Sequence, residues 1–325
     1  MLLWNRRTRA LALALFATAA LSWRGAPAWT LFVGYALSAM LPEIGPMSRT
    51  RWSHIYRDDP DQLHTALSFE QVLEEMAFVV GPVVAVLAST TLFPEAGLIL
   101  GEVFFAGGAL LFLAERRTEP PVVPHAERPG GLAIHRSGML VVPTVLFMVG
   151  VLFGANEVVA VAVSDEAGVK AFSSTILAAF AGGSAISGLL FGTRTLSGSI
   201  VRRFVLLGAA MSVLQAPVLL THNLWALAGI MFVAGSATAP MLITSLSLVQ
   251  RLVPKALLTE GMSVAVTGVL IGISSGTAVA GWLVELVGGQ AAYALPVVAA
   301  AIAASIAYAG RSRIHRGLAA AGETP

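Results

Sequence analysis

The chain has 325 residues, of which 56% are hydrophobic and 12% charged, with a formal net charge of +2 and a mean hydropathy of +0.80. A soluble domain carries about 25% charged residues. This composition therefore excludes a soluble enzyme, a nucleic-acid-binding domain and a disordered chain, and it predicts an all-α polytopic membrane protein. The chain has no cysteine, which excludes a disulfide framework and thiol catalysis.

The expected helices follow from the apolar runs between clusters of charge. A membrane helix needs about 20 mostly apolar residues, because the hydrocarbon core is about 30 Å thick. The sequence predicts ten spans, at residues 9–23, 28–46, 70–93, 96–114, 138–162, 171–192, 203–221, 224–248, 261–284 and 290–310. A signal peptide is the alternative for the first run, which follows Arg6-Arg7-Thr8-Arg9, although a second apolar span comes directly after it.

The basic residues predict the orientation, because Lys and Arg in short loops remain in the cytoplasm. With residue 1 inside, the expected inner segments hold 18 of the 20 basic residues, and only Arg24 and Lys170 lie outside. Both termini are therefore expected in the cytoplasm.

An internal repeat sets the expected architecture. At an offset of 194 residues, a gapless alignment pairs Pro46-Met47 with Pro240-Met241, Thr50 with Thr244, Ser53 with Ser247, Arg57 with Arg251, Pro60 with Pro254, Leu63 with Leu257 and Thr65 with Thr259. Parallel repeats of this kind are typical of a two-bundle transporter whose axis lies along the membrane normal.

The repeat also predicts the domains. We expect a four-span N-terminal bundle in residues 1–114, a cytoplasmic linker in 115–137, a six-helix bundle in 138–310 and a cytoplasmic tail in 311–325. Four spans against six suggest that the first bundle lacks the two helices that would precede residue 1.

Three segments resemble the major facilitator superfamily, and in particular its actinobacterial efflux-type members. They are Thr65-Ala-Leu-Ser-Phe-Glu70-Gln-Val-Leu-Glu74-Glu75 leading to Gly81-Pro82, Phe153-Gly-Ala-Asn156-Glu157-Val, and Ala239-Pro240-Met-Leu-Ile through Val249-Gln-Arg251-Leu-Val-Pro254 to Leu258-Thr259-Glu260. The resemblance covers the chain as the third to twelfth helices of that fold. It implies a monomeric carrier in a bacterial cell membrane, surrounded by the lipid bilayer.

The sequence departs from the superfamily at two motifs. In Gly188-Leu-Leu-Phe-Gly192-Thr-Arg194, the second copy of the loop motif, the expected acidic residue is absent. The antiporter motif of the fifth helix is reduced to Gly81-Pro82, which leaves uniport, symport and antiport open.

Acidic residues in the spans are the candidates for chemistry. An ionised side chain at mid-membrane costs at least about 2.5–3.5 kcal/mol, so it faces a cavity or a partner. Glu157, beside Asn156, is the first candidate for proton coupling or cation recognition, because the resemblance implies that its helix lines the central cavity. The alternative is an interfacial glutamate at the outer mouth.

The other acidic candidates lie in the first half of the chain. Glu74 and Glu75 either contact substrate or join Arg49, Arg51 and Arg57 in a cytoplasmic charge network that keeps the inward face closed. Glu102 either contacts substrate or makes a structural hydrogen bond. Two further basic residues at expected inner loops, Arg194 and Arg251, belong to the same predicted gate.

Small residues at four-residue spacing predict close helix packing, at sites where bundles either slide or simply pack. They are Gly188 and Gly192 in one span and Gly268, Gly272 and Gly276 in another. Gly81-Pro82 is expected to kink span 70–93, because proline cannot complete the helical hydrogen bonds.

We therefore expect a secondary carrier that moves a small organic molecule by alternating access, as proton-coupled efflux. The sequence has no nucleotide-binding loop, so the energy would come from an ion or substrate gradient. The alternatives are a truncated, non-transporting remnant of such a carrier and a polytopic membrane enzyme. An enzyme needs clustered polar residues, and His54, His64, His125, His135, His222 and His315 are scattered in expected loops and helix ends. We expect no catalytic activity, cofactor, metal or nucleic-acid partner.

Overall fold

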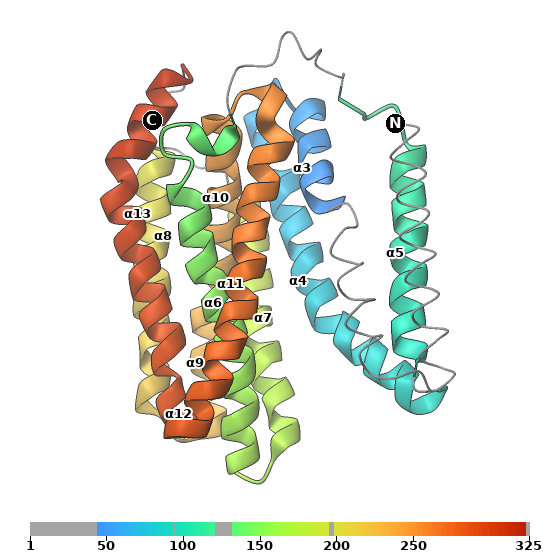
Figure 1. The fold of residues 1–325 in the computed structure, drawn as a ribbon, viewed down its shortest axis with the longest axis vertical. Helices are drawn as coiled ribbons and strands as arrows, with labels where there is room; N and C mark the ends of the chain where they lie inside the picture. Colours follow the sequence, from blue (N-terminus) through green and yellow to red (C-terminus); the bar gives the residue numbers. More distant parts are fainter. Residues whose placement is uncertain (1–43, 94, 121–131, 195–197, 323–325) are drawn as a thin grey trace. The chain divides into compact units, whose positions relative to one another are not determined.

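The computed structural model describes residues 44–93, 95–120, 132–194 and 198–322, except for several side chains between 75 and 98 and that of Lys255. Every regular element in these ranges is a helix (Figure 1), which confirms the all-α prediction for the described residues. The α-helices are α3 (Ile44–Ile55), α4 (Pro60–Thr91), α5 (Ala96–Ala114), α6 (Val141–Glu166), α7 (Ser173–Gly192), α8 (Ile200–Gln215), α9 (Leu224–Gly235), α10 (Thr238–Leu252), α11 (Leu258–Val287), α12 (Gly289–Ala292) and α13 (Ala294–Ala320). Short 3₁₀ turns η2 (Ala133–His135), η3 (Lys170–Phe172), η4 (Ala216–Leu220) and η5 (Lys255–Leu257) join them.

Six helical segments are long and apolar enough to cross a membrane. They are Val141–Glu166, Lys170–Gly192, Ile200–Leu220, Leu224–Leu252, Leu258–Val287 and Gly289–Ala320. These segments match the last six predicted spans within a few residues at most ends. The largest difference is at the C-terminus, where α13 continues to Ala320, ten residues beyond the predicted end and through much of the expected tail. By helix length and hydropathy, the chain is a multi-pass membrane protein.

The described residues show six such helices, not ten. The first two predicted spans lie outside the described residues, apart from 44–46 at the start of α3. Helix α4 covers most of the third predicted span, 70–93. The first half of this helix is polar, and its uncharged stretch runs only from Met76 to Thr91. Helix α5 coincides with the fourth predicted span, and its stretch Ile99–Ala114 is apolar, although it is not among the six membrane-length segments.

The chain divides into two compact units, one of residues 1–48 and 76–119 and the other of residues 49–75 and 120–325. In the first unit, α5 leaves large apolar side chains exposed, including Phe104 and Leu111 at 71% and 75%. A contiguous apolar surface of this kind is typical of a helix that contacts lipid.

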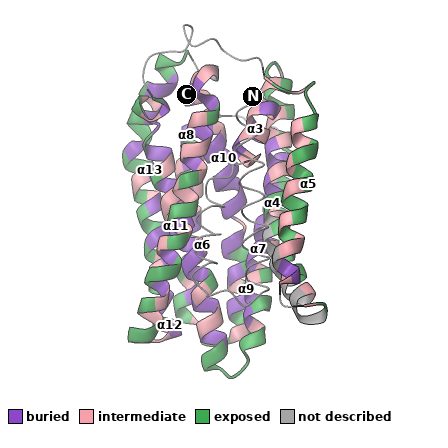
Figure 2. Ribbon diagram, turned by 45° about the vertical axis from the view of Figure 1, so that its right-hand side comes forward, coloured by how far each residue is buried: buried purple, intermediate pink, exposed green. Residues whose placement is uncertain are grey.

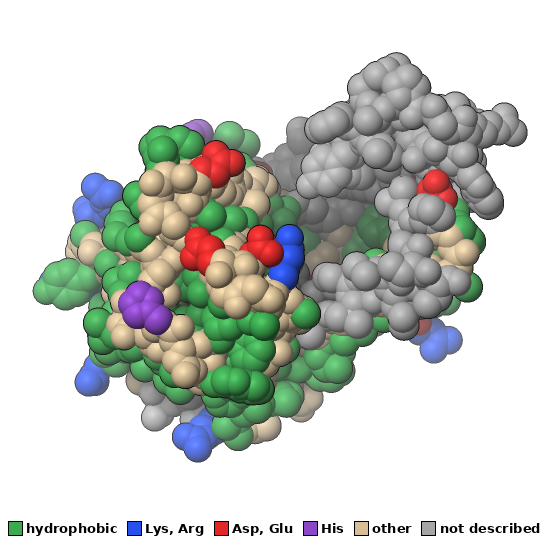
Figure 3. Space-filling view, turned by 90° about the horizontal axis from the view of Figure 1, so that it is seen from below, with side chains coloured by type: hydrophobic (Ala, Val, Ile, Leu, Met, Phe, Trp, Pro, Cys, Tyr) green, Lys and Arg blue, Asp and Glu red, His purple; other side chains and the backbone are tan. Residues whose placement is uncertain are grey.

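The second unit is built around α6 and α10. Helix α6 packs along α11 and α13, α7 along α9, and α8 along α13. Residues 237–246, most of them in α10, are all buried, as expected for a helix that is covered on every side. Buried residues form stripes along the helices and make up much of α10 (Figure 2), and hydrophobic side chains cover much of the end face seen in Figure 3.

Helices α6 and α11 approach so closely that glycine is required between them. A Cβ atom on Gly272 would lie 2.1 Å from the carbonyl oxygen of Phe147, and one on Gly276 would lie 2.3 Å from that of Val151. The first half of the chain offers no such restriction at Gly81, where a Cβ atom would meet nothing within 4 Å among the described atoms.

The sequence repeat reappears in the helix boundaries. Adding 194 to the bounds of α3 gives 238–249, and α10 runs from Thr238 to Leu252. The same shift places α4 at 254–285, which η5 and α11 occupy between Lys255 and Val287. The two copies of the repeat therefore form the same succession of helix, short turn and long helix.

Candidate functional site

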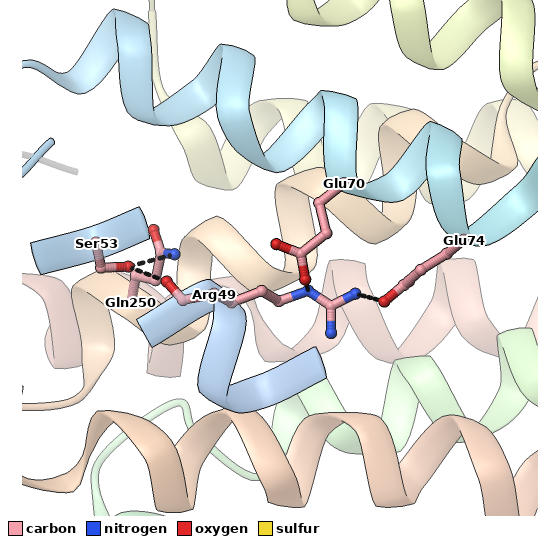
Figure 4. Close-up of polar contacts among 5 residues, drawn as sticks. All are labelled: Arg49, Ser53, Glu70, Glu74 and Gln250. Atoms are coloured by element: carbon pink, nitrogen blue, oxygen red, sulfur yellow. Dashed lines mark hydrogen bonds and ion pairs between the residues drawn. The ribbon is translucent and has the colours of Figure 1, made fainter. Parts of the chain in front are cut away.

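The two copies of the repeat lie against one another in the second unit. The hydroxyl oxygens of Thr50 on α3 and Thr259 on α11 are 3.3 Å apart. Beside them, the side-chain amide of Gln250 on α10 donates to the hydroxyl of Ser53 on α3 over 2.9 Å (Figure 4). We call these four residues the repeat contact.

Local sequence explains why α4 lies beside α3. Asp59 follows α3 and caps α4, because its carboxylate accepts from the backbone N–H of Gln62 over 3.0 Å. Pro60 occupies the first helical position, where its missing N–H costs no hydrogen bond. This tight turn reverses the chain and brings the side chains of α4 alongside α3.

Arg49 is the charged centre of the site. It is 3% exposed. Its guanidinium donates to the carboxylate of Glu74 and lies 3.6 Å from that of Glu70 (Figure 4). Glu70 and Glu74 are one helical turn apart on α4, so their carboxylates share a face and would repel each other without the cation between them.

The position of Arg49 links this ion pair to the repeat contact. The backbone carbonyl of Arg49 accepts a hydrogen bond of 2.9 Å from the hydroxyl of Ser53, which also receives the amide of Gln250. The charge network therefore holds α3 to α4, within one copy of the repeat, and fixes the side chain that meets the other copy.

A second contact joins α4 to the end of α7. The last carbonyl groups of a helix have no partner within it. Here the Nε2 atom of His64 lies 2.9 Å from the carbonyl oxygen of Phe191, and the hydroxyl of Thr65 lies 3.1 Å from that of Gly192. The side chains of α4 thus cap the carbonyl end of α7, and we call this arrangement the α4–α7 junction.

Gly192 allows the α4–α7 junction to close. A Cβ atom at this position would lie 2.2 Å from the Cβ atom of Ser68, which is 2% exposed. No side chain larger than hydrogen fits there without moving α4 away from α7.

The electrostatic surroundings of His64 favour its neutral form. Burial is the largest influence and lowers the pKa of the imidazole, and the charge of Arg203 on α8 acts in the same direction. The bond to the Phe191 carbonyl and the charge of Asp61 oppose these two effects without cancelling them. The Phe191 ring lies near both side chains, 5.3 Å from the imidazole by ring centroids and 6.0 Å from the Arg203 guanidinium carbon.

Asn156 and Glu157 are neighbours with opposite surroundings. Asn156 is 1% exposed, and its amide oxygen accepts from the side chain of Gln215 on α8 over 3.0 Å. Glu157 is exposed on α6. The two predicted candidates therefore do not form one site: Asn156 joins α6 to α8, and Glu157 faces outward from this helix pair.

The remaining acidic candidates lie apart from one another. Glu102 is half-buried on α5 in the first unit, and one of its carboxylate oxygens is buried without a hydrogen-bond partner among the described residues. The structural hydrogen bond expected for Glu102 is therefore not present at that oxygen. Glu75 belongs to α4, but its side chain is outside the described atoms.

The five predicted gate arginines differ in their surroundings. Arg49 has the two partners described above, whereas the exposed Arg57 pairs with its neighbour Asp58 at 3.1 Å. Arg51 is buried, Arg194 is exposed, and Arg251 acts electrostatically on Arg203.

The glycine stripes have different partners. Gly268, Gly272 and Gly276 pack α11 on α6. Gly188 and Gly192 face other helices: a Cβ atom on Gly188 would lie 3.1 Å from Ala239 of α10 and 3.4 Å from Val72 of α4. Helix α4 itself continues through Gly81-Pro82, and the side chain of Pro82 is outside the described atoms, so the expected kink stays a prediction.

Sequence reasoning missed three side chains that the structure places in contacts: His64, Gln215 and Gln250. Gln215 had a usable signal, because a lone amide in an apolar span needs a partner. His64 and Gln250 had none, since each is one polar residue among several at a helix end. The described residues contain no group of three or more His, Asp or Glu side chains placed to hold a metal ion.

Comparison of the sequence with protein-family models and with curated proteins finds no match. The superfamily resemblance therefore depends on the sequence motifs alone. The structure establishes a multi-pass, all-helical membrane protein in which two copies of an internal repeat meet through polar side chains.

Proposed function

We propose that the chain is a secondary active carrier of the major facilitator type, with ten spans in two bundles, which moves a small organic molecule by alternating access. The observation that carries this proposal is the repeat contact. In a carrier built from parallel repeats, equivalent segments lie at the same depth on either side of the axis, and one membrane face closes where they meet. Thr50 and Ser53 meeting Thr259 and Gln250 fits such a closed face.

The strength of the contact suits a gate. A hydrogen bond contributes about 0.5–1.5 kcal/mol net, so the repeat contact and the α4–α7 junction together amount to a few kcal/mol. A ligand that inverts a 1:99 equilibrium must favour one state by about 5.5 kcal/mol. Substrate and proton binding can therefore open a polar seam of this size, whereas separating the apolar core would cost far more.

In the proposed carrier this seam lies at the cytoplasmic side of a bacterial cell membrane, with both chain termini on that side, because the expected loops of that side hold most of the basic residues. In the proposed carrier, Arg49, Glu70 and Glu74 form a positioning network for the gate, because they fix α3 against α4 and hold Ser53 toward Gln250.

Proton coupling is assigned to Glu157. Glu157 is exposed on α6. In the proposed carrier its carboxylate binds either a proton or a cationic substrate, and efflux follows when one displaces the other. The buried amide pair of Asn156 and Gln215 keeps α6 against α8 behind it.

Cysteine cross-linking tests the gate directly, because the chain has no native cysteine. In Thr50→Cys/Thr259→Cys protein, oxidation should link the two helices, and each single variant serves as a control. A third cysteine at Glu157 should then react faster with a membrane-impermeant maleimide after cross-linking and slower after reduction. Equal labelling rates in the two states would contradict alternating access.

The transport claim needs a flux measurement. In proteoliposomes with an imposed pH gradient, the lipophilic cation ethidium is the first probe, and cross-linked Thr50→Cys/Thr259→Cys protein should lose flux that reduction restores. Glu157→Gln should abolish the dependence on the pH gradient. A pH-driven flux that Glu157→Gln leaves unchanged would overturn the assignment of that residue.

A further inference from the structure

We propose that His64 is a proton-sensitive contact: its neutral imidazole holds the α4–α7 junction closed, and a proton taken up on this side opens the junction. This inference rests on the carrier proposed above, and it assigns a regulatory site to a residue outside the predicted charge network.

The geometry makes the imidazole the centre of the junction. Its Nε2 atom lies 2.9 Å from the carbonyl oxygen of Phe191, and its ring packs against the ring of the same residue. The neighbouring Thr65 and Ser68 occupy the next positions along α4, against Gly192. A shift of His64 therefore changes the whole contact rather than one hydrogen bond.

The charges around His64 oppose a second cation. On its own helix, Asp61 is the acidic group that acts on it. From α8, the charge of Arg203, which lies 6.0 Å from the Phe191 ring, acts on His64, and from α10, Arg251 acts on Arg203. From α7, the ring and the carbonyl oxygen of Phe191 lie beside His64. The carbonyl end of a helix carries partial negative charge, so this end of α7 favours a cation.

The direction of the pH effect follows from the balance of these groups. Within the junction the pKa of His64 is lowered, first by burial and then by Arg203. Once the junction opens, water surrounds the imidazole and its pKa returns to about 6.5. Above about pH 6.5 both states are neutral, and the contact is at full strength. As the pH falls below that value, the open state takes up a proton first, so the ratio of closed to open protein decreases by up to about tenfold per pH unit.

In the cell, acidification of the side that faces this junction would open it. The contact then links the conformation of the carrier to the pH of one compartment, independently of the carboxylate assigned to coupling.

Spin-label distances test the inference in the full chain. We choose Asp58→Cys, in the turn before α4, and Arg313→Cys on α13, because both side chains are exposed and the chain offers no competing thiol. Between pH 8 and pH 5.5 the population of long distances should rise, with its onset near pH 6.5. His64→Gln retains an N–H donor for Phe191 but does not titrate, so it should remove the rise. His54→Gln, a matched change on α3, should leave the rise in place.

Two further variants keep the result decisive if His64→Gln also weakens folding. His64→Lys carries a permanent charge and should give the long distance throughout this pH range. Gly192→Leu should do the same by overlap with Ser68, and it calibrates the open distance. A pH response that survives in His64→Gln, or wild-type distances that do not change with pH, would overturn the inference and leave the carrier proposal standing. The proposed function fails separately, if cross-linking Thr50→Cys/Thr259→Cys does not alter labelling at position 157.

Discussion

Thr50 and Thr259 bring their hydroxyl oxygens within 3.3 Å across 209 residues of chain, yet the repeat does not pair them with each other. Thr50 corresponds to Thr244, and Thr259 corresponds to Thr65. The contact is therefore between different positions of the two copies. Its symmetric counterpart is not made, since Thr65 lies against Gly192 and the buried hydroxyl of Thr244 has no hydrogen-bond partner among the described residues.

This asymmetry predicts opposite effects for the same substitution in the two copies. Thr50→Val should lower the free energy of unfolding by about 0.5–1.5 kcal/mol, because it removes the bond to Thr259. Thr244→Val should leave stability unchanged or raise it by up to about 1 kcal/mol, because valine has the same shape and removes a buried polar group that lacks a partner. Thermal unfolding of the two single variants in detergent measures the difference. Equal destabilisation would mean that Thr244 has a partner, such as a buried water molecule.

Arg49→Ala should be among the most destabilising changes in the first repeat. It removes the guanidinium that lies 3.6 Å from the carboxylate of Glu70, which is 12% exposed, and that donates to Glu74. Breaking a buried ion pair costs about 3–5 kcal/mol, and we expect the lower end because Glu74 is 45% exposed and solvent screens it.

The matched control for Arg49→Ala is Arg57→Ala, on the same α3–α4 segment but 56% exposed. It should change stability by no more than about 0.5 kcal/mol. Adding Glu70→Gln and Glu74→Gln to Arg49→Ala should recover part of the loss. If Arg57→Ala proved as costly as Arg49→Ala, burial of the guanidinium would not be the cause.

Asn156 and Gln215 should behave as a coupled pair. Asn156→Leu or Gln215→Met alone leaves a buried amide without a partner, which costs about 1–3 kcal/mol. The double variant should cost less than the sum of the two single variants, and the double-mutant cycle should give a coupling energy of about 0.6 kcal/mol and at most about 1.7 kcal/mol, as found between membrane helices. If the losses of the two single variants simply add in the double variant, the two side chains contribute to stability by packing and not through their hydrogen bond.

Adjacent cysteines on α6 should report the two faces of the helix. Glu157→Cys should react with a charged, membrane-impermeant maleimide, and Asn156→Cys should not, because Asn156 is 1% exposed. Labelling at position 157 also shows whether this residue faces water or lipid, since a charged reagent does not enter the bilayer. If the cysteine at position 157 does not react in native membranes but does react after the protein is unfolded, Glu157 is not the coupling residue.

The helices of the second half of the chain were predictable from its sequence, whereas in the first half the first two predicted spans lie outside the described residues and α4 begins ten residues before the predicted span. From residue 138 onward, long apolar runs alternate with short charged loops, and each run became a membrane-length helix. Helix α4 combines a polar first half with an apolar second half, so a single apolar window locates its end but not its start at Pro60. The repeat offset located the α3–α4 and α10–α11 pairs because helix ends follow proline and capping residues, which are local signals.

The partners of individual side chains could not be read in the same way. Glu74 and Glu75 were predicted to join the arginines of the preceding segment in a charge network. Only the fold decides that Arg49 takes this place while Arg57 turns to Asp58. Likewise, Asn156 and Glu157 are one residue apart but differ by about 100° around the helix axis, and the sequence does not say which of the two directions is the interior.

The close approach of α6 and α11 has a mechanical consequence. Gly272 lies against the backbone of Phe147 and Gly276 against that of Val151, so α11 places no Cβ atom between the two helices at these positions. We expect rotation of either helix to produce a clash there. We expect the pair to behave as a single lever. A displacement of α11 at Thr259 would then also displace α6 and Glu157. The proposed gate and the proposed coupling residue would be linked by rigid backbone rather than by a series of side-chain rearrangements.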